Sequence, residues 1–232
     1  NTYLLISEEA AWDLLKTWRG ISGDFAHFSF RLACGFTAHP QETRFRSWAS
    51  DHPISLSSLF PGVAKEKVHP LDLGISGTWI GDREEAVDLE LFQWRLERLS
   101  RDVPEKIIAG GYMEPRALYE TDAYGRMGNQ GRENRTIHLG IDFWLPAGTT
   151  VHALFDGEVV ISVNDEGYRE YGGLIILKHR EDNLTFYTLH GHQSLDSVRR
   201  YRRGDRIRRG DLVGVIGTYP ENGNWVPHLH FQ

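Results

Sequence analysis

The last eight residues, "WVPHLHFQ" (225–232), place two histidines on either side of a leucine. Side chains along a β-strand repeat with a period of two, so His228 and His230 would lie on one face of a strand. The residues between and around them are mostly apolar, as a strand prefers. The stretch therefore predicts a strand whose two histidines can act on the same atom. The alternative is that the repeat arose by chance, and the rest of the chain has to decide between the two.

The composition limits the kind of protein that this chain forms. Its 232 residues are 40% hydrophobic, which is enough for a core in one large or two small domains. The net charge of -6 and the lack of a long basic run argue against nucleic acid or a membrane surface as a partner. A single cysteine, Cys34, excludes an internal disulfide framework. The acidic first 18 residues do not resemble a secretory signal, so we expect a cytoplasmic protein.

The hydrophobic pattern changes along the chain, and it predicts an α+β fold with a helical N-terminal part followed by an antiparallel β-sheet domain. Helical spacing is found at 7–18, 24–36 and about 41–49, and a stronger helix follows Asp82. A short strand is expected around Leu118. From about residue 136, short β-rich runs alternate with Gly, Asp and Asn; they are "TTVHALFDGEVVISVN", "GGLIILKHR", "LTFYTLHGH" and "GDRIRRGDLVGVIG".

We expect three parts along the chain. Residues 1–52 form a helical segment, residues 53–118 form a mixed connector with one main helix, and residues 119–232 form the β-rich domain. The chain lacks an initiator methionine and ends within a predicted strand, which indicates a piece of a longer polypeptide.

Histidines are concentrated in the β-rich part, which contains seven of the 11: His138, His152, His179, His190, His192, His228 and His230. "HLGID" places a histidine and an aspartate four residues apart, and "LHGH" repeats the spacing of "HLH". Zinc binds imidazole nitrogen and carboxylate oxygen, and a catalytic zinc uses three protein ligands and one water. Each pair alone is more often an ordinary hydrogen-bonded pair. Their joint occurrence favours a metal site, and the absence of HExxH excludes a helical zincin site.

Four motifs in this order, "HLGIDFWLPAGTTVHALFDGEVV", "TLHGH", "GDRIRRGDLVGVIG" and "HLHF", resemble the lysostaphin-type zinc metallopeptidases over about residues 136–232. Many members of that family cut peptidoglycan peptides. The resemblance implies one Zn²⁺ per chain bound by His138, Asp142 and His230. It implies that His192 and His228 are the catalytic histidines, and that the substrate is a peptide or amide bond.

One position departs from the family pattern. Where the family usually has an aromatic residue, two residues before the catalytic histidine, this chain has His190. By its period of two it would face the same side as His192, as a surrogate ligand, an added proton acceptor or a harmless replacement, of which we favour the last. The residues beside the motifs are candidates for the lining of a cleft: Tyr187, Glu221, Asn222 and Trp225.

A second resemblance covers most of the chain, through "FRLACGFTAHPQ", "MEPRALYETDAY", "RTIHLGIDF" and "PENGNWVPHLHFQ". These stretches are similar to the central segment of certain fused proteins. In those proteins a phosphotransferase-like domain precedes the segment and a class III aminotransferase follows it. The resemblance implies flanking domains in the same polypeptide. Pyridoxal phosphate would belong to that parent protein only, because this chain offers no convincing lysine site for it.

Two functions stay open at this point. The first is a zinc-dependent hydrolase of a peptide or amide bond. The second is a non-catalytic or latent metal-binding module, in which a fourth ligand, or Asn134 or Glu133, closes the open position of the metal. A lipoyl-type carrier is rejected, because the Gly-rich hairpin carries no lysine at its tip.

Overall fold

The computed structural model describes residues 40–75, 77–80, 85, 87–116, 124–128, 131–134, 136–181 and 183–232. The chain divides into two compact units, residues 1–52 and residues 53–232. In the first unit, helix α3 (Glu42–Asp51) occupies the stretch where a helix was predicted at 41–49. The helices predicted at 7–18 and 24–36, and the strand predicted around Leu118, lie outside the described residues.

The second unit is built on a sheet of eight strands in the order β1-β2-β7-β14-β11-β10-β9-β12. These strands are β1 (Lys67–Leu71), β2 (Lys106–Gly110), β7 (Ile141–Trp144), β9 (Gly157–Asp165), β10 (Gly172–Glu181), β11 (Leu184–Gln193), β12 (Arg206–Ile207) and β14 (Leu229–Phe231). All neighbouring pairs are antiparallel except β1 and β2, which run parallel. The predicted antiparallel sheet is thus confirmed, and the stretch 53–118 contributes two strands to it.

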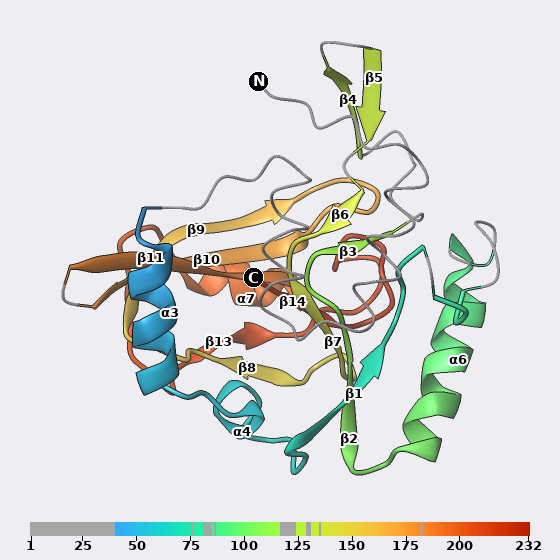
Figure 1. The fold of residues 1–232 in the computed structure, drawn as a ribbon, viewed down its shortest axis with the longest axis horizontal. Helices are drawn as coiled ribbons and strands as arrows, with labels where there is room; N and C mark the ends of the chain where they lie inside the picture. The colour runs from blue at the N-terminus through green and yellow to red at the C-terminus, as the bar shows by residue number, and fades with distance from the viewer. Residues whose placement is uncertain are drawn as a thin grey trace. The chain divides into compact units, whose positions relative to one another are not determined.

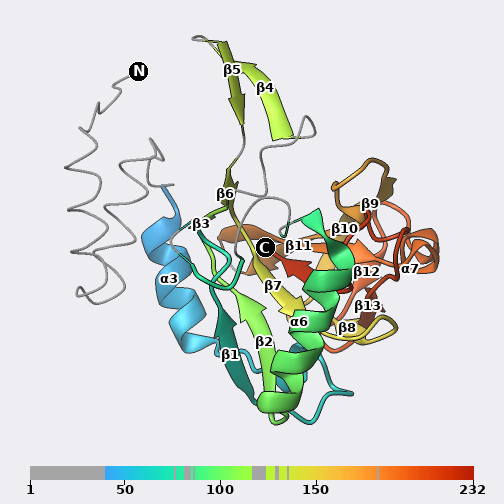
Figure 2. The same cartoon turned by 90° about the vertical axis from the view of Figure 1, so that its right-hand side faces the viewer.

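Among the described residues, the other strands form three small two-stranded sheets. They pair β3 (Glu114–Pro115) with β6 (Ile137–His138), β4 (Gly125–Gly128) with β5 (Gly131–Asn134), and β8 (Thr150–His152) with β13 (Leu212–Val215). The β4–β5 hairpin projects from the rest of this unit in both views (Figures 1 and 2). The β3–β6 pair lies close to the start of β7 and brings His138 beside the sheet.

Helix α6 (Leu89–Asp102) is the main helix that the sequence predicted. It begins seven residues after Asp82, because Asp88 caps it by accepting a hydrogen bond from the backbone N–H of Leu91 at 3.0 Å. Its apolar face packs on β2 and β7, where Leu96 joins a buried cluster with Ile108 and Trp144. The helix therefore covers the sheet beside the central strands, as Figure 2 shows.

The described part of the chain contains two further helices, both short: α4 (Leu56–Leu59) and α7 (Leu195–Arg200). The largest buried cluster lies around β7 and β14 and includes Phe60, Phe143 and Leu229. Apolar packing thus holds the central strands β7 and β14 in place. Among the described residues, no helix is long and apolar enough to cross a membrane.

Candidate metal centre

The sheet register brings together residues that are far apart in the sequence. β14 pairs with β7 so that His230 lies directly opposite Asp142, and it pairs with β11 so that His230 also lies opposite Gly191. His138 precedes Asp142 by four residues and lies at the end of β6. Directly opposed residues in a sheet have Cβ atoms about 4.5–5.5 Å apart. The pairing of a late strand with an early one therefore creates the site.

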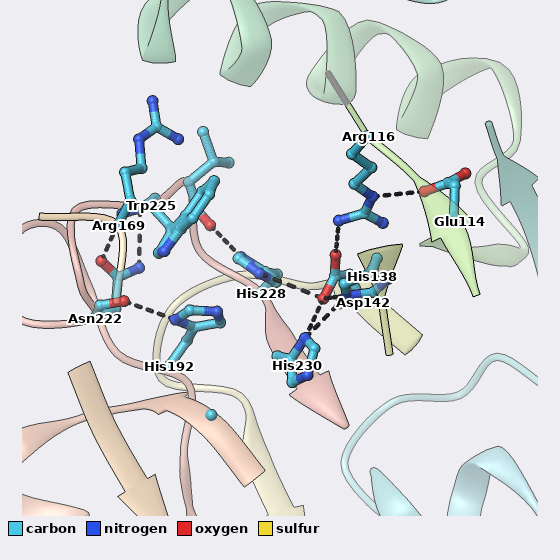
Figure 3. Close-up of polar contacts among 12 residues, drawn as sticks. Glu114, Arg116, His138, Asp142, Arg169, His192, Asn222, Trp225, His228 and His230 are labelled. Carbon is cyan, nitrogen blue, oxygen red and sulfur yellow. Dashed lines mark hydrogen bonds and ion pairs between the residues drawn. The ribbon is translucent and has the colours of Figure 1, made fainter. Parts of the chain in front are cut away.

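Three side-chain atoms converge within this register, as Figure 3 shows. His138 Nε2 lies 3.0 Å from His230 Nδ1 and 3.1 Å from Asp142 Oδ1, and His230 Nδ1 lies 3.0 Å from the same oxygen. All three residues are buried. They form a group whose ligand atoms lie within 4.8 Å of one another.

The protonation of the two imidazoles indicates what the group can hold. His138 Nδ1 lies 3.0 Å from the backbone oxygen of Gly111, which can only accept, so His138 donates there and, in the neutral ring, Nε2 carries a lone pair. In the described part of the chain, His230 Nε2 is buried without a hydrogen-bond partner. One proton between three electron-rich atoms cannot satisfy all of them, whereas a cation can. A tetrahedral zinc with ligand bonds of about 2.0–2.2 Å separates its ligand atoms by about 3.3–3.5 Å, so the group fits this ion closely.

Gly140, between the first two of these residues, has a steric reason to be glycine. A Cβ atom added at this position would lie 2.5 Å from the ring of His230 and 2.8 Å from the backbone oxygen of Phe231. The "HLGID" turn therefore has no side chain where the histidine ring of β14 passes over it.

The second oxygen of Asp142 has a different partner, which sequence reasoning missed. Arg116 donates from Nη1 to Asp142 Oδ2 at 2.6 Å and from Nε to Glu114 Oε2 at 2.6 Å. Burial by itself would raise the pKa of Asp142, but His138 and the Arg116 guanidinium together hold that pKa well below its ordinary value. The carboxylate is thus ionised and available as a ligand.

His192 and His228 lie together on the same side of this group, with ring centroids 4.2 Å apart. Nδ1 of His192 donates to the backbone oxygen of Asn222 at 2.8 Å, and Nδ1 of His228 donates to that of Val226 at 2.7 Å. Their Nε2 atoms are therefore the free acceptors in the neutral state, and His228 Nε2 lies 3.7 Å from Asp142 Oδ1.

The electrostatics of both rings favour this neutral state. Burial lowers the pKa of His192 well below its ordinary value, and the neighbouring His228 lowers it further. Burial also lowers the pKa of His228 to about 4, although the charge of Asp142 opposes the shift. Near neutral pH both imidazoles can accept a proton.

These groups surround a small cavity of about 40 Å³. Its lining comes from the sheet, from α6, from the segments after β1 and β3, and from the loops before β10 and β14: Leu73, Leu89, Phe92, Arg116, Asp142, Trp144, Arg169, His192, Trp225, Val226, His228 and His230. The ring of Trp144 is stacked on that of His228 with centroids 5.9 Å apart. The rings of Trp144 and Trp225 thus form aromatic walls beside the two imidazoles.

The other residues that the sequence singled out differ in whether they line the cavity. His190 lies outside the ligand group and outside the cavity lining, and its ring instead packs edge-on against Phe231. The expectation that it faces the same side as His192 is wrong, because His192 has a positive φ of 60° that breaks the period of the strand. Trp225 lines the cavity as expected.

Asn222 positions two residues that line the cavity. Its backbone oxygen accepts a hydrogen bond from His192, and its side-chain amide hydrogen-bonds to the backbone N–H and oxygen of Trp225. Glu221 instead accepts from the backbone N–H groups of Leu195 and Thr218, and Tyr187 is exposed on β11. The side chains of Glu133 and Asn134, which were considered as occupants of the open metal position, lie outside the described part of the chain.

The residues that sequence reasoning missed are Glu114, Arg116 and Arg169. The first two lie in "AGGYMEPRALYET", where Gly and Pro residues interrupt the pattern and the sequence predicted only a short strand around Leu118. Arg169 lies in the turn before β10, in a stretch where the sequence predicted no site residue. The one available signal was an arginine two residues after a glutamate in an otherwise apolar stretch, which is a weak pattern.

Comparisons with known proteins find similarity in the second half of the chain. The chain is 33% identical over 95 residues to the glycyl-glycine endopeptidase ALE-1 of Staphylococcus capitis, which covers 41% of this chain and 24% of that protein. It is 31% identical over 99 residues to lysostaphin of Staphylococcus staphylolyticus, covering 43% of this chain and 19% of that protein. The chain thus spans about a quarter of the length of these relatives, or less.

Among solved structures, the catalytic domain of lysostaphin from Staphylococcus simulans is 27% identical, with a TM-score of 0.33, and the match covers 42% of this chain and 66% of that one. Glu114 and Arg116 lie before the matched family segment, whereas all five predicted site residues lie within it. Residues 136–232 match the model of Peptidase family M23.

Proposed function

We propose that this chain is a zinc-dependent hydrolase of a peptide or amide bond, with His138, Asp142 and His230 as the metal ligands. The observation that carries the proposal is the convergence of three ligand atoms within 3.0–3.1 Å beside two further buried imidazoles. The match of residues 136–232 to a peptidase family supports it. A bound zinc would supply a water of lowered pKa and a positive charge for the carbonyl oxygen of the substrate.

The role of the two remaining histidines follows from their tautomers. Because the backbone carbonyls fix the proton of each ring on Nδ1, Nε2 of His192 and of His228 can accept a proton from the attacking water. A ring that has taken up a proton then donates it to the leaving amine, or donates a hydrogen bond to the carbonyl oxygen as negative charge develops there. The lowered pKa values of both rings mean that they begin the cycle uncharged.

A groove beside the cavity offers room for an extended substrate. A more open groove of about 580 Å³ adjoins it and shares the side chains of Leu89, Trp225 and Val226 with the cavity lining. Exposed aromatic rings of Trp94 and Tyr219 line the groove further out. Since the relatives include a glycyl-glycine endopeptidase, peptides with glycyl-glycine bonds are the first substrates to test.

The decisive experiment measures zinc content and peptide cleavage on the same preparations. The unaltered protein should bind about one zinc per chain, and His192→Ala should keep the zinc while hydrolysis falls by about 10²–10⁴-fold, the usual contribution of a general base. The matched control is His152→Ala, whose partly buried ring bonds to Gly210 and is not part of the cavity lining. Loss of zinc in His192→Ala, or full activity in it, would contradict the assignment.

A latent metal site is the second candidate, and the size of the cavity favours it. A space of about 40 Å³ holds one or two waters and no peptide. Arg169 helps to close it, because its guanidinium donates to the backbone oxygen of Val87 at 3.2 Å and lies 4.3 Å from the ring centre of Trp225.

Removing the contacts of Arg169 distinguishes the hydrolase from the latent metal site. If the site is catalytic but closed, Arg169→Ala should raise peptide cleavage in the zinc-loaded protein. If the module is non-catalytic, both proteins bind zinc and neither cleaves any peptide of a broad panel. The flanking phosphotransferase-like and aminotransferase domains, with their pyridoxal phosphate, remain a prediction about a longer polypeptide.

A further inference from the structure

A buried chain of charged groups extends from the candidate metal ligands to residues outside the matched family segment. Arg116, which is 3% exposed, lies between the carboxylates of Glu114 and Asp142 and makes a 2.6 Å ion pair with each (Figure 3). Asp142 thus uses its two oxygens differently. Oδ2 contacts the guanidinium, whereas Oδ1 faces the nitrogens of His138 and His230.

The backbone around Arg116 holds this arrangement from several directions. Its N–H donates to the backbone oxygen of Thr136 at 2.8 Å, and Glu114 lies opposite His138 in the β3–β6 pair. The other oxygen of Glu114, Oε1, accepts from the backbone N–H of Leu73 at 2.9 Å. Both oxygens of this carboxylate are therefore occupied, which fixes the guanidinium in turn.

The same segment also reaches the other end of the ligand group. The backbone oxygen of Gly111 accepts from His138 Nδ1 at 3.0 Å. Gly110 leaves room for the guanidinium, because a Cβ atom there would lie 2.8 Å from Arg116 Nη2 and 2.9 Å from the ring of Trp144. Residues 110–116 therefore orient two of the three candidate ligands without contributing a ligand atom of their own.

The physical consequence concerns how the carboxylate can bind a metal. A free aspartate can bind with one oxygen or with both, and it can rotate between these modes. An arginine fork that takes one oxygen in a buried site removes this freedom. Groups that hydrogen-bond to metal ligands typically change metal affinity by about 10–100-fold when they are mutated.

We propose that Arg116, held by Glu114, is a positioning residue that restricts Asp142 to binding the metal through Oδ1 alone. This inference rests on the proposed metal site, and it adds that the site is complete only with residues 110–116, which precede the matched segment. A protein that begins at residue 136 would lack this support.

The test compares Arg116→Lys with the unaltered protein in two measurements that do not depend on catalysis. Zinc affinity, measured by competition with a chelator, should fall by about 10–100-fold. The visible spectrum of the cobalt(II)-substituted protein should change, because a lysine cannot hold one oxygen with the same geometry and the carboxylate is freed to bind through both. Arg95→Lys is the matched control, since Arg95 makes a 2.8 Å ion pair with Glu85 and is not part of the cavity lining.

Each outcome has a distinct meaning. If the unaltered protein binds no zinc, the proposed function fails. If it binds zinc and Arg116→Lys has the same affinity and the same cobalt spectrum, only the positioning role is overturned. If Arg116→Lys does not fold, Glu114→Gln takes its place, because it keeps the shape of the side chain and removes the charge that holds the guanidinium. Affinity in Glu114→Gln should fall by about tenfold, and an unchanged affinity would overturn the proposal.

Discussion

The surroundings of His179 and the candidate metal centre both contain deeply buried histidines, but of these two places only the second has the properties of a metal site. His179 is 0% exposed and His138 is 2% exposed, so burial does not distinguish them. His179 lies 2.8 Å from the backbone oxygen of Asp156 through Nδ1 and 2.8 Å from the hydroxyl of Thr188 through Nε2. Both of its nitrogens have protein partners.

At the candidate metal centre the partners are incomplete. The Nε2 of His138 faces Nδ1 of His230 and Oδ1 of Asp142, and no proton arrangement satisfies all three. The difference teaches that a buried histidine is a structural group when its two nitrogens pair with the protein. It becomes a candidate metal ligand when one of its ring nitrogens faces other acceptor atoms that no arrangement of protons can satisfy.

The largest effect that this comparison predicts concerns metal content. We expect His230→Ala to bind no zinc, because it removes one of three ligands, whereas His179→Gln should keep about one zinc per chain. Elemental analysis of both purified proteins measures this directly. Equal zinc content in His230→Ala and the unaltered protein would show that the ligand assignment is incorrect.

The second prediction concerns the free energy of unfolding. Zinc at a free concentration of 1,000 times its dissociation constant should stabilise the unaltered protein by about 4 kcal/mol, since it binds the folded state. Thermal or urea unfolding with and without zinc should show the same increment in His179→Gln and none in His230→Ala. An increment in His230→Ala equal to that of the unaltered protein would place the metal elsewhere.

The third prediction concerns His190, a buried histidine outside both groups. Burial lowers its pKa to about 3, so between pH 6.5 and 3 the unfolded chain binds a proton there that the folded protein does not. The contribution of the buried neutral ring to the free energy of unfolding is fully present above about pH 6.5. As the pH falls from 6.5 to 3, the free energy of unfolding falls by about 1.4 kcal/mol per pH unit. His190→Gln should therefore reduce the loss of stability between pH 7 and pH 5 by about 2 kcal/mol.

Urea unfolding at the two pH values measures this loss. Other histidines with lowered pKa values act in the same direction, so the substitution should reduce the slope without abolishing it. An identical slope in His190→Gln would mean that the ring is not buried in the neutral form.

The last prediction concerns His179 itself. His179→Gln should lower the free energy of unfolding by about 1–3 kcal/mol, because the substitution leaves a buried hydroxyl or carbonyl without its hydrogen bond. Phe155 and Phe186, whose rings pack against His179, should limit rearrangement around the new side chain. Zinc affinity in this variant should equal that of the unaltered protein, and a large loss of affinity would remove the distinction between the two sites.

Local patterns in the sequence were sufficient to predict much of the fold. The alternating apolar residues and glycine-rich turns of residues 149–217 correctly predicted β8 to β13, because a strand with one buried face has a period of two. Helix α6 was predicted from its apolar face, and the residues directly after Asp82, where the helix was expected to start, are only partly described. The period also misplaced His190, because a single positive φ at His192 cannot be read from side-chain type.

The sequence by itself determined which residue types were available for a metal site and that His228 and His230 would lie on one face. Only the tertiary structure decided that β14 pairs with β7, which sets His230 opposite Asp142. It also decided that Arg116 and Glu114 fix the far side of that carboxylate. The physical reason is that periodicity reports the environment of a residue along its own strand, whereas contacts between strands that are distant in sequence depend on register and loop path.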